Sequence, residues 1–236
     1  MTDEIANTNG TEGEKSSSSE RLLVIGGGGH GRVVAEAAHL SAQFSQIVVV
    51  DPYAIDSWTL PFCKCVAAEA AIDADPQSWD FVSAVGGASL RKRLFDEYSA
   101  KGFTPARVMH PRAIVSPSAY LGRGVVVLAG AVVATLASIE DGVIVNHNAV
   151  VEHDCKVGQF AHLAPGSILA GGACLEDKVF LGAAASVRHG VRVGADIVIG
   201  NGAAVVADIF QQGVYVGTPA SLIKSTSTFK ENDNER

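Results

Sequence analysis

The sequence predicts a small α/β domain followed by a solenoid of short parallel β-strands. From Val115 to Phe210 the chain divides into sixteen consecutive hexapeptides without an insertion, and each begins with Val, Leu or Ile. Ahead of this array, a short apolar run enters a glycine-rich turn, which a helical pattern and a second apolar run follow. A fixed short period indicates coils that stack and bury one continuous apolar column. The preceding pattern is typical of a β-α-β unit.

Residues 1–20 are expected to form a disordered acidic tail. They hold five acidic residues against one lysine, and so carry −4 of the formal net charge of −7. They are also rich in Ser, Asn and Thr and lack apolar periodicity, as disordered segments do. What remains is close to neutral, which argues against a nucleic-acid partner. No apolar run approaches the roughly 18 residues of a membrane span, so we expect no membrane insertion and a cytoplasmic protein.

Residues 21–108 are predicted to form a Rossmann-like domain that binds a nucleotide. A strand over residues 22–25 runs into the turn Gly26–Gly31, and a second strand over residues 47–50 ends at Asp51. Glycines at a helix N-terminus let a phosphate approach the unpaired backbone N–H groups. Only one more strand, over residues 81–85, and one more helix, over about 89–100, are expected before the solenoid. That is too little for a full dinucleotide fold, and it favours a smaller nucleotide than NAD.

Residues 109–224 are predicted to form the solenoid, and residues 225–236 a polar tail. The first and fifth positions of each hexapeptide are apolar and should point inward, while Gly at the second and fourth positions should supply tight turns. Cys155 occupies a fifth position and is expected in the core. Cys63 and Cys65 form a lone CxC pair, which we do not expect to bind a metal, and four cysteines suit a reducing compartment.

Several features together resemble the hexapeptide-repeat sugar O- and N-acetyltransferases, which act on bacillosamine-type and perosamine-type nucleotide sugars or on sialic acid. They are the GGGGHG turn, the strand-end Asp51, the helix with Arg91, the segment from His110 to Ala119, and Glu152–Cys155. The resemblance covers about residues 20–224. It implies a left-handed parallel β-helix with three hexapeptides per coil, a homotrimer, and acetyl-CoA bound between neighbouring β-helices. It also implies that the α/β domain holds the nucleotide of the sugar.

With eighteen residues per coil, residues eighteen apart stack about 4.8 Å from each other. Thr135, His153, Gly171 and His189 then form one column. His153 lies at a corner, and a histidine suits a general base because its pKa lies near neutrality. The resemblance implies Asp154 as its helping carboxylate. Gly171 leaves room for the thioester, and its N–H is the candidate donor to the oxyanion.

The resemblance also implies two sets of binding residues. Those expected near the nucleotide sugar are Gly29, His30, Gly31, Asp51 and Asn146. Those expected near acetyl-CoA are His162, Gly171, Ala183, Asn201 and Lys224. His162 could instead be a buried structural histidine, and Lys224 a solvated one. The sequence departs from the family at Pro52, at Gly86–Arg91 and at His147, which leaves the base and the sugar open.

The predicted function is an acetyl-CoA-dependent N-acetyltransferase that acts on a nucleotide-linked amino sugar of the 4-amino-4,6-dideoxyhexose type, for surface glycan synthesis. O-acetylation of a sialic-acid-like sugar is the alternative. A further alternative is a metal enzyme of the γ-carbonic anhydrase type, with His147, His153 and His162 as metal ligands. The spacing of these histidines in the sequence does not match the ligand pattern of that family. We therefore expect no metal. A nonenzymatic nucleotide-binding scaffold is a further possibility, which the Glu152–Cys155 coil disfavours.

Overall fold

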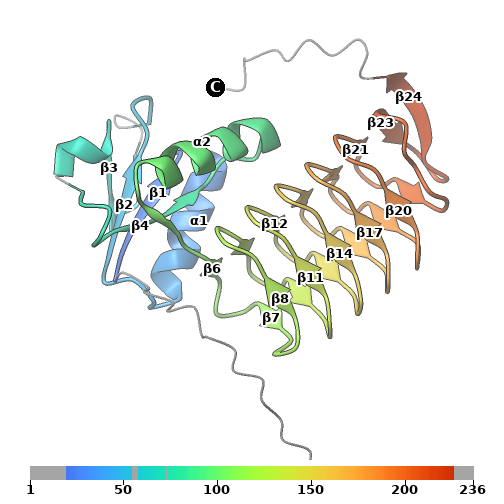
Figure 1. Ribbon diagram of the computed structural model, residues 1–236, viewed down its shortest axis with the longest axis horizontal. Coiled ribbons are helices and arrows are strands. Elements are labelled where there is room, and N and C mark those ends of the chain that lie inside the picture. Colours follow the sequence, from blue (N-terminus) through green and yellow to red (C-terminus); the bar gives the residue numbers. More distant parts are fainter. Residues whose placement is uncertain (1–19, 55–57, 73, 226–236) are drawn as a thin grey trace, which may run out of the picture.

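The computed structural model describes residues 20–54, 58–72 and 74–225. Except for their terminal residues 20 and 225, the two predicted tails lie outside these ranges. An α/β domain packs against one side of a long β-helix, which rises coil by coil toward a C-terminal hairpin (Figure 1). The fold class is the one predicted, while the predicted domain boundaries stay predictions.

The α/β domain is built on a five-stranded parallel sheet in the order β3-β2-β1-β4-β5. The strands are β1 (Arg21–Ile25), β2 (Gln46–Val50), β3 (Lys64–Val66), β4 (Asp80–Ser83) and β5 (Thr104–Pro105). The sequence did not predict β3 or β5, and the prediction of only one further strand was wrong. Both are short edge strands with little apolar patterning. The predicted strand over residues 81–85 begins and ends earlier, as β4.

Two helices cover opposite faces of this sheet, α1 (Gly29–Leu40) and α2 (Ala88–Ala100), and a 3-10 turn spans Glu69–Ile72. Alternate strand residues point to opposite faces. Accordingly Leu22 and Val24 pack in one apolar cluster with α1, whereas Leu23 and Ile25 pack in another with aromatic residues of α2. The sheet is therefore buried on both faces, which explains its nearly continuous apolar strands.

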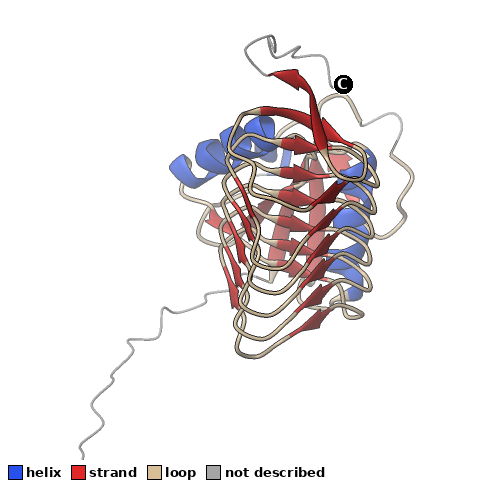
Figure 2. Cartoon of the chain, turned by 90° about the vertical axis from the view of Figure 1, so that its right-hand side faces the viewer, coloured by secondary structure: helices blue, strands red, loops and turns tan. Residues whose placement is uncertain are grey.

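The β-helix has three faces, each a parallel ladder of two-residue strands before the final hairpin (Figure 2). The first face contains β6 (Val108–Met109), β9 (Val126–Val127), β12 (Ile144–Val145), β15 (His162–Leu163), β18 (Phe180–Leu181), β21 (Val198–Ile199), β23 (Gly213–Val216) and the antiparallel β24 (Ser221–Ser225). The second contains β7 (Ile114–Val115), β10 (Val132–Val133), β13 (Val150–Val151), β16 (Ile168–Leu169), β19 (Ser186–Val187) and β22 (Ala204–Val205). The third contains β8 (Tyr120–Leu121), β11 (Ser138–Ile139), β14 (Lys156–Val157), β17 (Cys174–Leu175) and β20 (Arg192–Val193).

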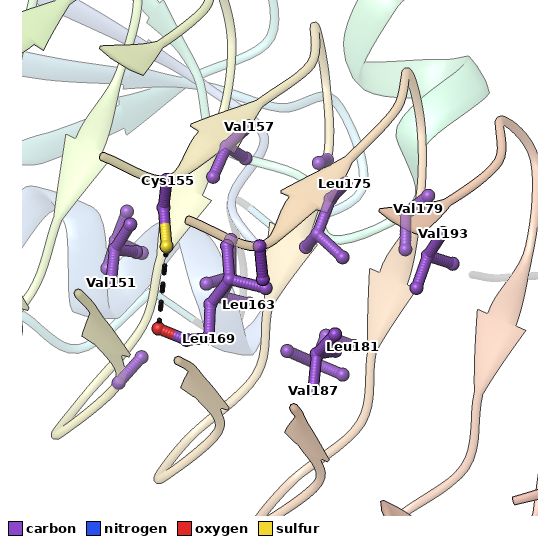
Figure 3. Packing of buried hydrophobic residues seen from close by; sticks show 14 of the residues in the cluster. Val151, Cys155, Val157, Leu163, Leu169, Leu175, Val179, Leu181, Val187 and Val193 are labelled. Carbon is purple, nitrogen blue, oxygen red and sulfur yellow. Dashed lines mark hydrogen bonds between the residues drawn. The ribbon is translucent and has the colours of Figure 1, made fainter. Parts of the chain in front are cut away.

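Strand pairing confirms the predicted register of eighteen residues. Val133, for example, pairs with Val115 in the coil before it and with Val151 in the coil after it. First and fifth positions fill the interior as one continuous cluster (Figure 3). Cys155 is fully buried there, as predicted. Burying one Val, Leu or Ile stabilises a fold by about 1.5–3 kcal/mol, so this column is the main source of the stability of the β-helix.

Glycine serves two different purposes in the repeats. Every fourth position from Gly124 to Gly202 has a positive φ, including non-glycine residues such as Asp154 and Phe160. The fourth-position glycines thus supply turns, as predicted. At the second position the prediction was wrong, because those glycines have no positive φ. A Cβ on Gly122 or Gly158 would lie 2.6 Å from backbone of the next coil. Close stacking of coils therefore excludes a side chain there.

The α/β domain and the β-helix share an interface. Outward residues of the first face, Val126, Leu128 and Ile144, join the apolar cluster that α1 covers. Arg91 of α2, only 1% exposed, also crosses the interface. Its guanidinium donates to the Gly142 carbonyl at 2.8 Å, and to carbonyls of Phe160 and of Ala161. It also binds the Val85 and Gly86 carbonyls of its own domain. One side chain thus ties both units together.

Replacing Arg91 with Met should therefore destabilise the protein. The variant keeps most of the apolar stem but leaves buried carbonyls without a donor, so the free energy of unfolding should fall by about 2–4 kcal/mol in urea denaturation. Arg93→Met, at an exposed position of the same helix, is the matched control and should change it by less than about 0.5 kcal/mol. Equal stabilities of the two variants would contradict a role of Arg91 in joining the units.

Candidate active site

His153 and Asp154 form a hydrogen-bonded pair at the corner between β13 of the second face and β14 of the third. The distance between His153 Nδ1 and Asp154 Oδ2 is 2.8 Å, and both side chains are more than half exposed. Asp154 occupies the fourth position of its hexapeptide with φ +60°, and this turn places its carboxylate beside the ring. With Nδ1–H donated to the carboxylate, Nε2 presents a lone pair that can accept a proton.

Gly171 lies directly against the histidine, one coil further on. A Cβ on Gly171 would lie 2.5 Å from His153 Nε2, and the Gly172 N–H donates to the His153 carbonyl at 2.8 Å. The predicted column is thus present. Any side chain at position 171 would displace the ring or cover its reactive nitrogen.

The Gly171 N–H is a donor with no acceptor among the described residues. At three other corners, those of Arg123, Gln159 and Ala183, the third-position N–H donates to an Asp or Asn side chain eighteen residues later. Asp141 accepts from Arg123, and Asp177 accepts from Gln159, at 2.6 and 2.9 Å. In the column of Gly171 the residue eighteen positions later is His189. The Gly171 N–H therefore remains a free donor in the residue that lies against the His153 ring, and a backbone donor of this kind can stabilise an oxyanion.

The glycine-rich turn opens onto the N-terminus of α1. A Cβ on Gly29 would meet no atom within 4 Å, and Gly28 precedes the helix without a side-chain cap. Open space beside uncapped N–H groups at a helix N-terminus suits an anion. Gly31 differs, because a Cβ there would lie 2.0 Å from the Gly26 carbonyl oxygen. The fold itself requires glycine at position 31, whatever the turn binds.

Asp51, at the end of β2, holds this turn in place. Its Oδ2 accepts the Gly27 N–H at 2.7 Å, and its Oδ1 accepts the Tyr53 N–H at 2.8 Å. The carboxylate was expected near the base or ribose of the nucleotide. That expectation stays a prediction, since the carboxylate bridges two backbone segments while each oxygen keeps a second lone pair for a ligand.

His30, Asn146 and His162 come together where the turn meets the first face. Asn146 Nδ2 lies 3.1 Å from His162 Nε2, and the centroids of the His30 and His162 rings are 6.0 Å apart. Asn146 and His162 are both 8% exposed. Burial lowers the pKa of His162 to about 3, with smaller contributions from Arg91 and His30. It lowers the pKa of His30 to about 4, helped by Arg91 and His147. Both rings are therefore neutral near pH 7.

The remaining predicted residues lie further along the β-helix. Ala183 N donates to Asn201 Oδ1 at 2.9 Å, so that N–H is occupied while the Asn201 amide group keeps its own donors. Lys224 is exposed on β24, opposite Val214 in the closing hairpin. Sequence reasoning assigned no role to Glu152, whose Oε2 accepts the His153 N–H at 3.2 Å. Its place directly before the histidine was the only signal.

The described residues contain no cluster of side chains that would support the metal-enzyme alternative. Within residues 20–54, 58–72 and 74–225, no three His, Cys, Asp or Glu side chains are grouped to hold a metal ion. His153 lies at the corner between the second and third faces, whereas His162 lies in β15 of the first face and His30 in α1. In the same ranges, no helix has the length and apolarity that a membrane crossing needs.

Comparison with known proteins agrees with this arrangement. The family described as the PglD N-terminal domain matches residues 21–98. The acetyltransferase domain of PglB from Neisseria gonorrhoeae FA1090, also solved with acetyl coenzyme A, is 35% identical with a TM-score of 0.82, over 86% of this chain and 100% of that one. PerB from Caulobacter crescentus, solved with CoA and GDP-perosamine, is 36% identical with a TM-score of 0.76, over 86% and 96% of the two chains. WeeI from Acinetobacter baumannii AYE, at 21% identity and a TM-score of 0.77, shares the fold.

These similarities define the class of the protein. The chain belongs to the hexapeptide-repeat sugar acetyltransferases, in which a small α/β domain precedes a left-handed β-helix.

The neutral histidines predict a pH dependence of stability. When the pKa of a group is lower in the folded than in the unfolded state, the folded protein binds fewer protons at any pH between these two pKa values. Lowering the pH through this range therefore favours the unfolded state. For His30 and His162, stability should therefore be fully present above about pH 6.5 and fall as the pH drops toward 4. Urea titrations from pH 7.5 to 4.5 test this. His162→Gln should lose stability less steeply on acidification, whereas an unchanged slope would contradict the account.

Proposed function

We propose that this protein is an acetyl-CoA-dependent N-acetyltransferase that acts on a nucleotide-linked amino sugar, of the 4-amino-4,6-dideoxyhexose type, in surface glycan synthesis. The observation that carries the proposal is the packing of His153 Nε2 against Gly171, where a Cβ would lie 2.5 Å from that nitrogen, with Nδ1 held by Asp154. PglB in complex with acetyl coenzyme A and PerB with CoA and GDP-perosamine support the two substrate classes. PerB is an N-acetyltransferase, which favours N- over O-acetylation.

In the proposed reaction the acceptor amine attacks the carbonyl carbon of the acetyl thioester. His153 Nε2 takes the proton from the amine as the carbon–nitrogen bond forms. The carbonyl oxygen then carries negative charge, and the Gly171 N–H stabilises it. When the carbon–sulfur bond breaks, the imidazolium can return the proton to the CoA sulfur. Asp154 orients the ring and stabilises the imidazolium, as in other base-and-carboxylate pairs.

The two substrates are proposed to occupy separate halves of the molecule. The phosphates of the nucleotide sugar would bind Gly29 and His30 at the start of α1, where open space meets the helix N-terminus. Asn146 and Asp51 would contact other parts of this substrate. Acetyl-CoA would lie along the β-helix near Gly171 and contact Ala183, Asn201 and Lys224. We do not propose the predicted contact of acetyl-CoA with His162, because His162 is buried beside Asn146 and His30 on the first face.

A homotrimer is part of the proposal. The α/β domain packs on the first face of the β-helix, while His153 lies at the corner between the second and third faces. One chain thus presents its glycine-rich turn and its general base, His153, on different sides. In a trimer, the glycine-rich turn of a neighbouring chain would lie beside each His153.

The free cysteines among the described residues support a reducing, cytoplasmic location.

Replacing His153 with Asn should lower kcat by about 10²- to 10⁴-fold, because the reaction loses its general base. Affinity for acetyl-CoA, measured by calorimetry, should change little. The rate should recover partly at high pH, where the free amine needs no base. His189→Asn, two coils further along the same column, is the control and should keep wild-type activity. An unchanged rate for His153→Asn would remove this residue from the mechanism.

Replacing Gly29 with Val should raise KM for the nucleotide sugar. The turn has room for the side chain, but that room is where the phosphates would bind. Acetyl-CoA binding should stay near wild type, since the β-helix buries its own core. If acetyl-CoA binding falls instead while the oligomer stays intact, the glycine-rich turn serves CoA and the assignment of substrates is wrong.

A further inference from the structure

Tyr53 is an aromatic residue whose side chain is almost free of contacts with the part of the chain that the structure describes. It is 95% exposed, whereas Tyr98 and Tyr215 are 4% and 7% exposed. It follows β2 by three residues, at the carboxyl edge of the parallel sheet. In open α/β sheets this edge is where ligands bind. An aromatic side chain this exposed contributes little to the packing of the domain.

The backbone of Tyr53 is fixed relative to the glycine-rich turn. One carboxylate, that of Asp51, accepts the N–H of Tyr53 through Oδ1 and the N–H of Gly27 through Oδ2. Ala54 also packs under the turn, since a Cβ on Gly27 would lie 2.6 Å from the Ala54 Cβ. Pro52 restricts the intervening backbone further. The backbone of Tyr53 is therefore held close to the N-terminus of α1, while its aromatic ring is exposed.

We propose that the Tyr53 ring is the stacking platform for the base of the nucleotide sugar, which rests on the proposed function of the turn as its phosphate site. Each oxygen of Asp51 accepts one backbone N–H and keeps one lone pair for a ligand, and Pro52 carries neither a polar side chain nor an N–H. Asp51 therefore leaves few polar contacts for the edge of a base at this edge of the sheet. Stacking on an aromatic ring needs no such edge and accepts any base. The enzyme should therefore discriminate weakly between purine and pyrimidine nucleotides.

Calorimetry with three probes tests this proposal: GDP, UDP and inorganic pyrophosphate, which has no base. Tyr53→Ala should raise Kd for both nucleotides by about 5- to 150-fold, the usual effect of removing a stacking ring. Its Kd for pyrophosphate should match wild type. Tyr53→Phe should bind all three probes like wild type. Tyr120→Ala, which removes another exposed tyrosine from the third face, is the matched control and should change nothing. In assays, Tyr53→Ala should raise KM for the nucleotide sugar with kcat retained.

Each other outcome overturns the proposal in a recognisable way. If Tyr53→Ala binds the nucleotides like wild type, Tyr53 is no platform, while the proposed function stands. If it loses pyrophosphate equally, Tyr53 acts by shaping the turn. If Tyr53→Phe is as weak as Tyr53→Ala, the hydroxyl and not the ring makes the contact. If the wild-type protein binds none of the three probes, the nucleotide site in the proposed function fails as well.

Discussion

The register of eighteen residues per coil is the constraint on which the rest of the structure depends. First and fifth positions of every hexapeptide must point inward for the coils to bury a common core. Once they do, a residue's neighbours in the coils before and after it are determined. His153 and Gly171 are thus brought together by core packing that involves neither of them. A single inserted residue between them would turn every later side chain out of register and separate the two.

The second constraint is how the α/β domain is attached. Alternating residues of β1 give each sheet face its own cluster, and one of these extends onto the first face of the β-helix. Arg91 adds polar contacts with the backbone of two coils. Because its carbonyl partners belong to corner residues such as Gly142 and Phe160, the contact is specific for a position along the β-helix. The glycine-rich turn is thereby held on the first face of the β-helix, away from the corner of His153.

Much of this arrangement could be predicted from the sequence, because it follows from periodicity. The period of six fixed the inward positions, and the column containing His153 and Gly171 followed once the family resemblance supplied three hexapeptides per coil. The roles of Arg91 and Asp51 could not be predicted in the same way. Arg91 binds a carbonyl 51 residues away, and Asp51 binds an N–H 24 residues away. Such contacts depend on how the units pack. The edge strands β3 and β5 were missed since pairing with neighbours, and not local pattern, defines them.

The central claim is that His153 and Gly171 together hold the reacting atoms. A crystal structure with CoA and a nucleotide-linked amino sugar measures this most directly. The account predicts the acceptor nitrogen about 2.6–3.2 Å from His153 Nε2, or bridged to it by one water. It also predicts that the Gly171 N–H points at the site of the thioester oxygen. An acceptor amine beyond the reach of His153, even through a water, with Gly171 covered by another group, would contradict it.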